Sequence, residues 1–439
     1  MKVLIASTPL MGHLNPLLAI GRTLIDDGHE VLGLSASVMR DRIQAIGAAF
    51  RAFPAAADLD LSNRDALFPE WKKIPPGPER LRFALERVYV DAIPAQNDGL
   101  RKVLQEFPAD VIIGDNLFLG ILPTLQIPRS KRPSIVICGT SFLHLRRDDG
   151  APLFAGLPPA ISDARREEYA ALSRKRDTVL DEPVRRYLNA CLTGLGVEPL
   201  SMDLLDAMIE SPDAYLQLTV PSFEFPRRDL PTSVHFVGAL PIIPNQAPVP
   251  SWANELDGSR KVVLATQGTL SNFDFDQLVA PTLTALANEP DVLVVVTAGG
   301  RPIDSISGPI PSNARLASYL PFEWLLPKVD AFVTNGGYGS VNQALSFGVP
   351  LVAAGLTEDK ADVNARVAWS GVGIDLKTNE ATPQALRGAI RDVLDKPDYR
   401  ARASAIGKEF RAIDTRSEIL RIIEEVSGVS DESRRVANL

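Results

Sequence analysis

The stretch Thr334-Asn335-Gly336-Gly337-Tyr338-Gly339-Ser340 says most about the fold of this chain. It follows a short apolar run at 331–333 and precedes a run with helical spacing, Val341–Phe347. The order predicts a strand, a glycine-rich turn and a helix. Glycines let a backbone approach a ligand closely, and the unpaired N–H groups of a helix's first turn bind anions such as phosphate. The turn is therefore a candidate phosphate site, although glycines at such a turn also serve close helix–strand packing.

Short, continuously apolar runs recur on both sides of this turn and alternate with helical patterns. Continuous rather than alternating runs predict parallel strands that are covered on both faces. These runs lie at 3–6, 31–34, 111–113, 134–137, 262–265, 292–296 and 331–333. The chain has 439 residues, which is too long for one ordinary core. The sequence therefore predicts an α/β protein of two doubly wound domains.

Proline marks the expected linker, because this residue is excluded from central strands and helix interiors. Prolines are dense between Pro241 and Pro250. We place an N-terminal domain at 1–220, the linker at 221–250, a C-terminal domain at 251–410 and a helical tail at 411–439.

Two segments interrupt the first domain. We interpret 54–78 and 145–186 as irregular insertions, which are either lids or binding loops or else surface decoration. The segment from Pro397 to Val426 has the pattern of helices.

The composition excludes several classes of function. The formal net charge is −8, from 46 basic and 54 acidic residues, so a nucleic-acid partner is not expected. Cys138 and Cys191 show no metal spacing, no clustered Asp/Glu motif suggests a metal site, and no apolar run reaches the roughly 18 residues of a membrane span. The N-terminus has no signal-peptide layout. We expect a cytoplasmic monomer or homodimer without an integral membrane segment, a metal or another cofactor.

The loop after the first predicted strand carries a histidine, His13, between Thr8 and Pro16. We expect the following helix at 17–26. The loop lacks the G-x-G-x-x-G pattern, so a Rossmann dehydrogenase is not indicated. Ligands of open α/β sheets bind at the carboxyl ends of strands, and histidine is the usual general base. His13 is therefore a candidate base.

A catalytic imidazole usually has a carboxylate that orients it. Asp115 ends the predicted strand at 111–114 and so lies at the same sheet edge as His13. Asp110 precedes that strand and should lie at the opposite edge. The other histidines receive no catalytic role: His29, His144 and His235.

Taken together, these features resemble the inverting glycosyltransferases of family 1, which use nucleotide sugars and have the GT-B fold of two Rossmann-like domains facing a cleft. The resemblance covers nearly the whole chain. Gly12-His13 with Pro16 is similar to the family's catalytic-histidine loop, and Asp115 matches its supporting aspartate. The resemblance also implies a C-terminal tail that crosses back onto the N-terminal domain.

The donor signature is carried by several segments in the second half of the chain. Gln267-Gly268-Thr269 resembles the first donor turn, Tyr319-Leu320-Pro321 the base-binding segment, and 334–373 the main signature in order and spacing. The resemblance implies a donor-binding set of Gly268, Thr269, Tyr319, Leu320, Asn335, Gly337, Gly339, Ser340, Gln343, Asp359 and Lys360.

The sequence departs from the signature at four positions. Asn335 replaces a diphosphate-binding histidine, Gln343 a ribose-binding glutamate, and Lys360 and Phe322 two glutamines. Exchanging a charged hydrogen bond for a neutral one should cost about 1 kcal/mol of donor affinity, which Lys360 could partly offset. Because His13 and Asp115 remain, we interpret these changes as marks of a variant subgroup.

The resemblance implies that His13 deprotonates a hydroxyl of a small apolar acceptor and that an α-linked donor, by default a UDP-hexose, yields a β-glycoside. Uridine and thymidine both remain open as the donor base. Aromatic residues of the N-terminal half are the candidate acceptor-binding set, or else simply core. They are Phe68, Phe83, Phe118 and Phe142, with Phe53, Trp71 and Phe154 nearby in the sequence.

The aromatic residues suit a phenolic, flavonoid, polyketide or macrolide-like acceptor, and a sterol or lipid alcohol is an alternative. Two further alternatives are a non-catalytic protein that binds nucleotide sugars or activates a partner, and a sugar-nucleotide epimerase.

Overall fold

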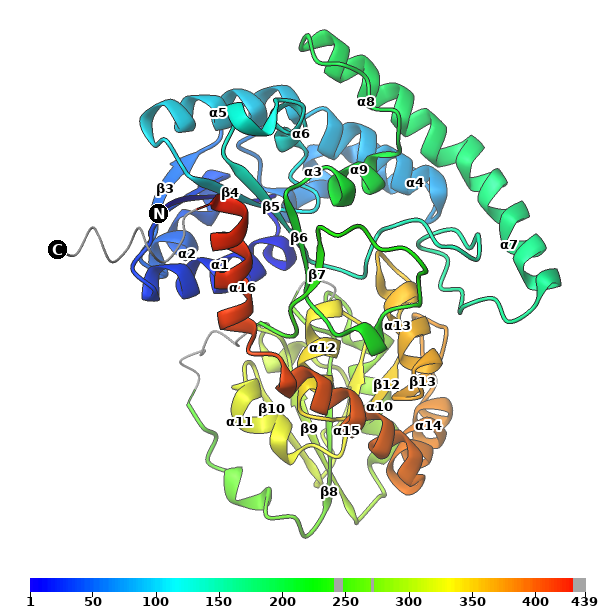
Figure 1. Cartoon of the computed structure of the whole chain (residues 1–439). Coiled ribbons are helices and arrows are strands. Elements are labelled where there is room, and N and C mark those ends of the chain that lie inside the picture. The colour runs from blue at the N-terminus through cyan, green and yellow to red at the C-terminus, as the bar shows by residue number, and fades with distance from the viewer. Residues whose placement is uncertain (241–247, 270–271, 429–439) are drawn as a thin grey trace.

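The computed structural model describes residues 1–240, 248–269 and 272–428 and contains two parallel β-sheets flanked by helices (Figure 1). The first sheet has the order β3-β2-β1-β4-β5-β6-β7. Its strands are β1 (Lys2–Ala6), β2 (Glu30–Ser35), β3 (Ala49–Ala52), β4 (Val111–Asp115), β5 (Ser134–Gly139), β6 (Ala214–Gln217) and β7 (Val234–Phe236). All seven predicted strand runs, across both sheets, are strands in the structure.

The second sheet has the order β10-β9-β8-β11-β12-β13. Its strands are β8 (Lys261–Thr266), β9 (Val292–Thr297), β10 (Ala314–Ala317), β11 (Ala331–Thr334), β12 (Leu351–Ala353) and β13 (Gly373–Asp375). In both sheets the strand order reverses beside the first strand, between β1 and β4 and between β8 and β11. Open α/β sheets bind ligands at this switch point, outside the carboxyl ends of the strands.

Helices connect the strands and cover the sheets. They are α1 (Met11–Asp26), α2 (Arg40–Ala45), α3 (Arg64–Leu67), α4 (Pro78–Phe83), α5 (Ile93–Glu106), α6 (Leu122–Leu125), α7 (Asp163–Arg176), α8 (Glu182–Gly194), α9 (Leu204–Glu210), α10 (Val279–Leu286), α11 (Phe322–Leu325), α12 (Tyr338–Ser346), α13 (Lys360–Trp369), α14 (Pro383–Asp395), α15 (Pro397–Ala412) and α16 (Thr415–Ser427). None of the helices in the described ranges has both the length and the apolar composition to span a bilayer.

Helix α1 begins at Met11, so the expectation of a helix from residue 17 is wrong. Leu10 is the N-cap, and its carbonyl accepts hydrogen bonds from the N–H groups of His13 and Leu14 at 3.0 and 2.9 Å. Pro16 lies inside the helix. The helix continues through Pro16, although a proline at this position has no N–H group to donate to the preceding turn. His13 is thereby fixed on the first helical turn.

The segment 145–186 is also more regular than expected, because it contains α7, which projects from the body of the protein (Figure 1). Ser162 caps this helix by accepting a hydrogen bond from the N–H of Arg165 at 3.3 Å, and only Tyr169 is buried. A helix that is polar on nearly every face shows no apolar period, so the sequence pattern did not reveal it. The helical prediction for 397–426 is confirmed by α15 and α16.

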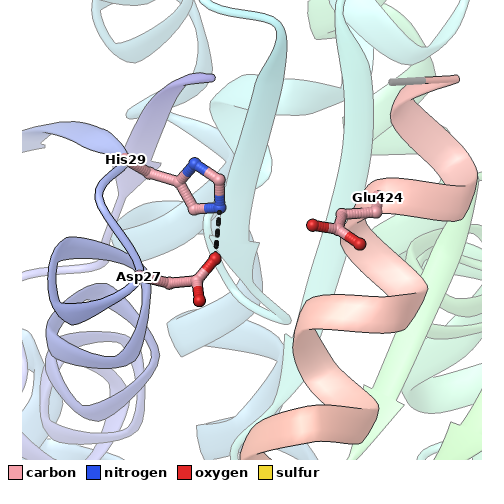
Figure 2. A group of neighbouring side chains, drawn as sticks. All are labelled: Asp27, His29 and Glu424. Atoms are coloured by element: carbon pink, nitrogen blue, oxygen red, sulfur yellow. Dashed lines mark ion pairs between the residues drawn. The ribbon is translucent and has the colours of Figure 1, made fainter. Parts of the chain in front are cut away.

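Helix α16 crosses from the second sheet to the first and packs against α1, β5 and β6 (Figure 1). Glu424 of α16 faces Asp27 and His29 (Figure 2). One carboxylate oxygen of each acidic residue and one imidazole nitrogen of His29 lie within 4.8 Å of one another. His29 Nε2 is 3.3 Å from Asp27 Oδ2, and the Met1 ammonium is 3.2 Å from His29 Nδ1. The charged cluster joins α16 to the turn after α1.

The proposed domain boundaries remain predictions. Of the linker and the tail, residues 241–247 and 429–439 lie outside the described residues.

Candidate active site

The two residues predicted as the catalytic pair lie together at the switch point of the first sheet. Ala6 of β1 pairs with Gly114 of β4, which brings the carboxyl ends of the two strands side by side. His13, on the first turn of α1 after β1, then reaches Asp115 at the end of β4, and His13 Nδ1 lies 2.8 Å from Asp115 Oδ1. The side chain of His13 is 17% exposed and that of Asp115 is fully buried.

Asp115 is held as a carboxylate by its hydrogen-bond donors. The N–H and hydroxyl of Thr8 donate to it at 2.7 and 3.0 Å, and the N–H of Leu117 donates at 2.9 Å. Burial alone would raise the pKa of this carboxyl, but the charge of His13 and these hydrogen bonds prevail and lower it. The buried carboxylate can therefore stabilise a protonated imidazole on His13.

The surroundings of His13 also fix its tautomer. Asp115 can only accept, so His13 Nδ1 carries the hydrogen and donates it. Thr140, at the end of β5, places its hydroxyl oxygen 3.2 Å from the same Nδ1. This arrangement leaves the lone pair on Nε2 of the partly exposed ring, which is the atom that can take a proton from a ligand.

The glycine-rich turn lies at the switch point of the second sheet, between β11 and α12. Gly337 is the N-cap and the helix begins at Tyr338, three residues earlier than the apolar spacing indicates. Gly336 has a φ of +95°, and a Cβ there would lie 2.0 Å from Asn364 Oδ1. Only glycine fits this position, so Gly336 is a residue that the predicted site set missed. The exposed Gly339 and the half-buried Gly337 and Ser340 follow on the helix start.

Helix α12 is anchored to the end of the first sheet. The Gln217 side-chain amide donates to the Tyr338 hydroxyl at 2.5 Å, and the Thr219 hydroxyl donates to Asn342 Oδ1 at 2.6 Å. The start of α12 therefore faces the carboxyl end of β6. The sequence gives no signal for these contacts, because they depend on how the two sheets face each other.

Two of the departures from the donor signature lie at one small pocket beside the turn. Asn335 donates from Nδ2 to the Gln267 carbonyl at 2.8 Å. Lys360, at the start of α13, is buried and its ammonium contacts Glu358. The pocket is lined by Gln267, Gln277, Leu278, Asn335, Ala354, Gly355, Thr357, Lys360 and Asn379. A cation thus lies close to the position where the signature histidine is missing.

Asp359 links the two halves of the site. Its carboxylate accepts a hydrogen bond from the Ser141 hydroxyl at 2.5 Å. Burial raises the pKa of Asp359, whereas the charge of Lys360 and the Ser141 hydrogen bond lower it, and the net direction is upward. Because Thr140 contacts His13 and its neighbour Ser141 contacts Asp359, the predicted base and the predicted sugar-binding carboxylate lie on either side of one short segment.

The remaining predicted donor residues line the edge of the second sheet. Gly268, with a φ of +71°, and the exposed Thr269 follow β8. Tyr319 follows β10 and is 46% exposed, and a Cβ on Gly300 would lie 2.7 Å from its ring. Leu320 is buried. Gln343 is half-buried on α12.

The predicted acceptor residues fall into two groups. Phe118 stacks on Phe53 at 5.8 Å between ring centroids, and both Phe118 and Phe142 are fully buried, so neither offers surface to a ligand in this structure. Phe68 and Phe83 are half-buried and meet edge to face at 6.3 Å. Only this second pair, from the 54–90 region, is partly accessible.

The paired parallel sheets, with their turns at the switch points, have the GT-B fold. A solved structure of CalG4, the calicheamicin glycosyltransferase, superposes with a TM-score of 0.72 at 20% identity, covering 98% of this chain and 99% of that one. VinC, solved in complex with dTDP, superposes with a TM-score of 0.67 at 21% identity, covering 97% and 100%.

Sequence comparisons give the family. Residues 282–426 match the model of the erythromycin biosynthesis protein CIII-like C-terminal domain. The chain is 37% identical to 4'-demethylrebeccamycin synthase of Lentzea aerocolonigenes, over 96% of this chain and 99% of that protein. It is also 37% identical to UDP-glycosyltransferase 2 of Phaeomoniella chlamydospora, over 97% and 95%. The chain belongs to the family 1 glycosyltransferases, the UDP-glycosyltransferase family, and is an enzyme of that class.

Proposed function

We propose that this enzyme is an inverting glycosyltransferase that moves a hexose from a UDP-sugar to a hydroxyl of a small apolar acceptor. The observation that carries the proposal is the His13–Asp115 pair, with its 2.8 Å contact, its buried carboxylate and its partly exposed imidazole. The acceptor class we propose is phenolic, flavonoid, polyketide or macrolide-like.

In the proposed reaction His13 Nε2 takes the proton of the acceptor hydroxyl while that oxygen attacks the anomeric carbon. The bond from that carbon to the diphosphate oxygen breaks, and UDP leaves with the bonding electrons. Attack and departure occur on opposite faces, so an α-linked donor gives a β-glycoside. Asp115 keeps the imidazole oriented and stabilises its positive charge, as the carboxylate of a catalytic triad does. General base catalysis of this kind contributes about 10²–10⁴-fold.

The proposed donor site uses the backbone of the glycine-rich turn for the diphosphate. The N–H groups of the first turn of α12, which have no partner within the helix, and the Ser340 hydroxyl would donate to its oxygens, as helix N-termini do for phosphates. Lys360 would supply the positive charge that Asn335 does not, and Asp359 would accept hydrogen bonds from sugar hydroxyls. The proposal assigns the stabilisation of the leaving group to these residues and includes no metal or other cofactor.

The names of the relatives support a uridine donor. UDP-glycosyltransferase 2 matches over almost the whole chain at 37% identity, and UDP-glucosyltransferase B1 of Starmerella bombicola at 31% over 93% of this chain. The dTDP in the VinC structure belongs to a protein that is only 21% identical. UDP-glucose is therefore the first donor to test, and dTDP-glucose the second.

The test is an incubation of the purified protein with UDP-glucose and a pool of flavonoids, polyketide phenols, macrolide aglycones and sterols. Mass spectrometry would detect hexose adducts, and proton NMR of each product would give the anomeric configuration. We expect β-linked adducts of a phenol, flavonoid or polyketide. An α-linked product would contradict the inverting mechanism, and adducts of sterols alone would contradict the acceptor class. UDP binding without any adduct from either donor would contradict the proposed reaction.

A further inference from the structure

His144 is a buried imidazole close to the proposed base that the proposed mechanism does not use. It is 6% exposed. The rings of Phe142 and Phe154 lie 4.6 and 5.0 Å from it, centroid to centroid. Burial, together with the positive charge of Arg366, lowers the pKa of His144 to about 3. The ring is therefore neutral at physiological pH and has one N–H group and one lone pair.

A chain of hydrogen bonds connects His144 to His13. The Thr140 hydroxyl, which lies 3.2 Å from His13 Nδ1, donates to Asn116 Oδ1 at 2.8 Å, and the Thr140 N–H donates to the same oxygen at 3.2 Å. Two donors on one atom identify that atom as the amide oxygen. The amide nitrogen of Asn116 must then point the other way, where His144 Nδ1 lies 3.4 Å from it.

These hydrogen bonds determine which nitrogen of His144 carries the hydrogen. An amide nitrogen only donates, so Nδ1 of His144 accepts through its lone pair and Nε2 carries the N–H. In the described ranges of the chain, no hydrogen-bond partner lies within reach of Nε2, although the atom is buried. A buried donor without a partner costs free energy, and such groups are rare in native proteins unless a ligand or water satisfies them.

A ligand explains the unpaired Nε2–H group of His144 better than a bridging water does. A buried water needs several polar partners, and the rings of Phe142 and Phe154 that pack against the imidazole supply none. The same surroundings suit an aromatic ligand with a single oxygen directed at Nε2, since ligand sites combine apolar walls with a few placed donors.

The segment that covers His144 is held in an unusual conformation. Phe154 has a φ of +60°, which is unfavourable for a bulky side chain. Two contacts hold the loop there: Arg176 donates to the Leu153 carbonyl at 2.5 Å, and the Gly156 N–H donates to Asp362 Oδ2 at 3.0 Å. Asp362 belongs to α13, the helix that begins beside Asp359. The loop that carries Phe154 over His144 is thus hydrogen-bonded to α13, which lies on the side of the site where we propose that the donor binds.

We propose that His144 binds the acceptor: its Nε2–H donates a hydrogen bond to a carbonyl oxygen of a fused-ring phenol, in the space that Phe154 occupies here. The inference rests on the proposed function and narrows it to acceptors that carry an oxygen besides the reacting hydroxyl. Asn116 and Thr140 link the two imidazoles by hydrogen bonds. They therefore fix the positions of His144 Nε2 and His13 Nε2 relative to one bound acceptor.

The test compares two acceptors that differ in one oxygen. 7-Hydroxyflavanone has a ring carbonyl, and 7-hydroxyflavan has a methylene group in its place. His144→Phe keeps the ring and its aromatic contacts but removes the donor, whereas His144→Gln retains an N–H near the Nε2 position. His235→Phe, in β7 of the first sheet, is the matched control. The readouts are kcat/KM for each acceptor with UDP-glucose, UDP affinity by calorimetry and the melting temperature.

For His144→Phe we expect kcat/KM to fall about tenfold with 7-hydroxyflavanone, the size of one lost hydrogen bond, and to stay within about twofold with 7-hydroxyflavan. His144→Gln should recover most of the loss. The melting temperature of His144→Phe should stay close to that of the wild type, because the variant removes one unsatisfied buried donor but leaves the Asn116 amide without its acceptor, and UDP affinity should not change.

Other outcomes separate this inference from the proposed function. Equal losses with both flavonoids, or a marked fall in the melting temperature of His144→Phe with no change in kcat/KM, would show that His144 is structural. A wild type that glycosylates other phenols but neither flavonoid would overturn the inference and leave the proposed function standing. A wild type that glycosylates nothing would contradict both.

Discussion

The two halves of the site are built in different ways. At the first sheet, the proposed function is concentrated in two side chains, His13 and Asp115, which come from positions 102 residues apart and meet at 2.8 Å. At the second sheet, the turn is one continuous segment. The features that suit it to bind an anion are its backbone N–H groups and the conformation of Gly336. Several side chains of its signature are replaced, at Asn335, Gln343 and Lys360.

This difference suggests how each half tolerates change. A backbone anion site survives side-chain exchange, because the N–H groups at a helix start do not depend on residue type. A general base and its supporting carboxylate act through their side chains, so no backbone group can replace them. Substitution should therefore be severe at the dyad, moderate at the turn's glycine and small at the exchanged side chains.

Among the residues that surround His13 and the turn, the largest effect is expected at Asp115. Asp115→Asn should lower kcat about 10³-fold, because the amide no longer stabilises the imidazolium and can hold the wrong tautomer. UDP affinity should stay within a few-fold. Asp110→Asn is the matched control, since Asp110 lies at the opposite end of the same strand and accepts from the Lys2 N–H. Equal kcat losses in the two variants would contradict the assignment of Asp115.

A smaller but clear effect is expected at Gly336. In Gly336→Ala the new Cβ would collide with Asn364 Oδ1 and the residue would keep an unfavourable φ. We expect the KM for UDP-glucose to rise at least tenfold and the free energy of unfolding to fall by about 1–3 kcal/mol.

The control for that variant is Gly388→Ala on α14, where a Cβ meets nothing within 4 Å. It should leave the KM unchanged and, if anything, stabilise the helix. An unaltered UDP-glucose KM in Gly336→Ala would mean that the turn does not bind the diphosphate.

Restoring the signature histidine at position 335 should increase the affinity for UDP modestly. Asn335→His adds a group that can be charged, so UDP should bind up to about fivefold more tightly at pH 6, when the imidazole is protonated, and less so at pH 8. Calorimetry with UDP measures the gain, and uridine, which lacks the phosphates, should show none. Tighter binding of uridine would place Asn335 away from the diphosphate.

The smallest effect is expected where the two halves meet. Ser141→Ala removes the hydroxyl that donates to the Asp359 carboxylate at 2.5 Å. This hydrogen bond lowers the pKa of Asp359, so its loss should raise that pKa further. The rise in UDP-glucose KM toward acid should therefore begin at a pH up to about one unit higher than in the wild type. A profile shifted toward acid would contradict the assignment.

Local patterns explain what the sequence predicted well. The strands were recognisable because parallel strands buried on both faces are apolar without interruption, as in β9, where every residue is buried. His13 and Asp115 could be paired because the carboxyl ends of β1 and β4 share one sheet edge.

Features without a local signal escaped prediction. The early start of α1 depends on carbonyl contacts of Leu10 rather than on an apolar period, and α7 buries only one residue. The contacts Ser141–Asp359 and Gln217–Tyr338 depend on how the two sheets face each other, which no local pattern encodes. Phe118 and Phe142 illustrate the same limit, because an aromatic residue of the core and one of a ligand pocket look alike in sequence.

The most direct test of the account is the single-turnover rate of His13→Ala with UDP-glucose and an acceptor from the pool, measured beside its UDP affinity. We expect the rate to fall by about 10³-fold or more while UDP binding stays within a few-fold, because the base is lost and the glycine-rich turn is intact. A rate close to that of the wild type, with UDP bound normally, would show that His13 is not the base.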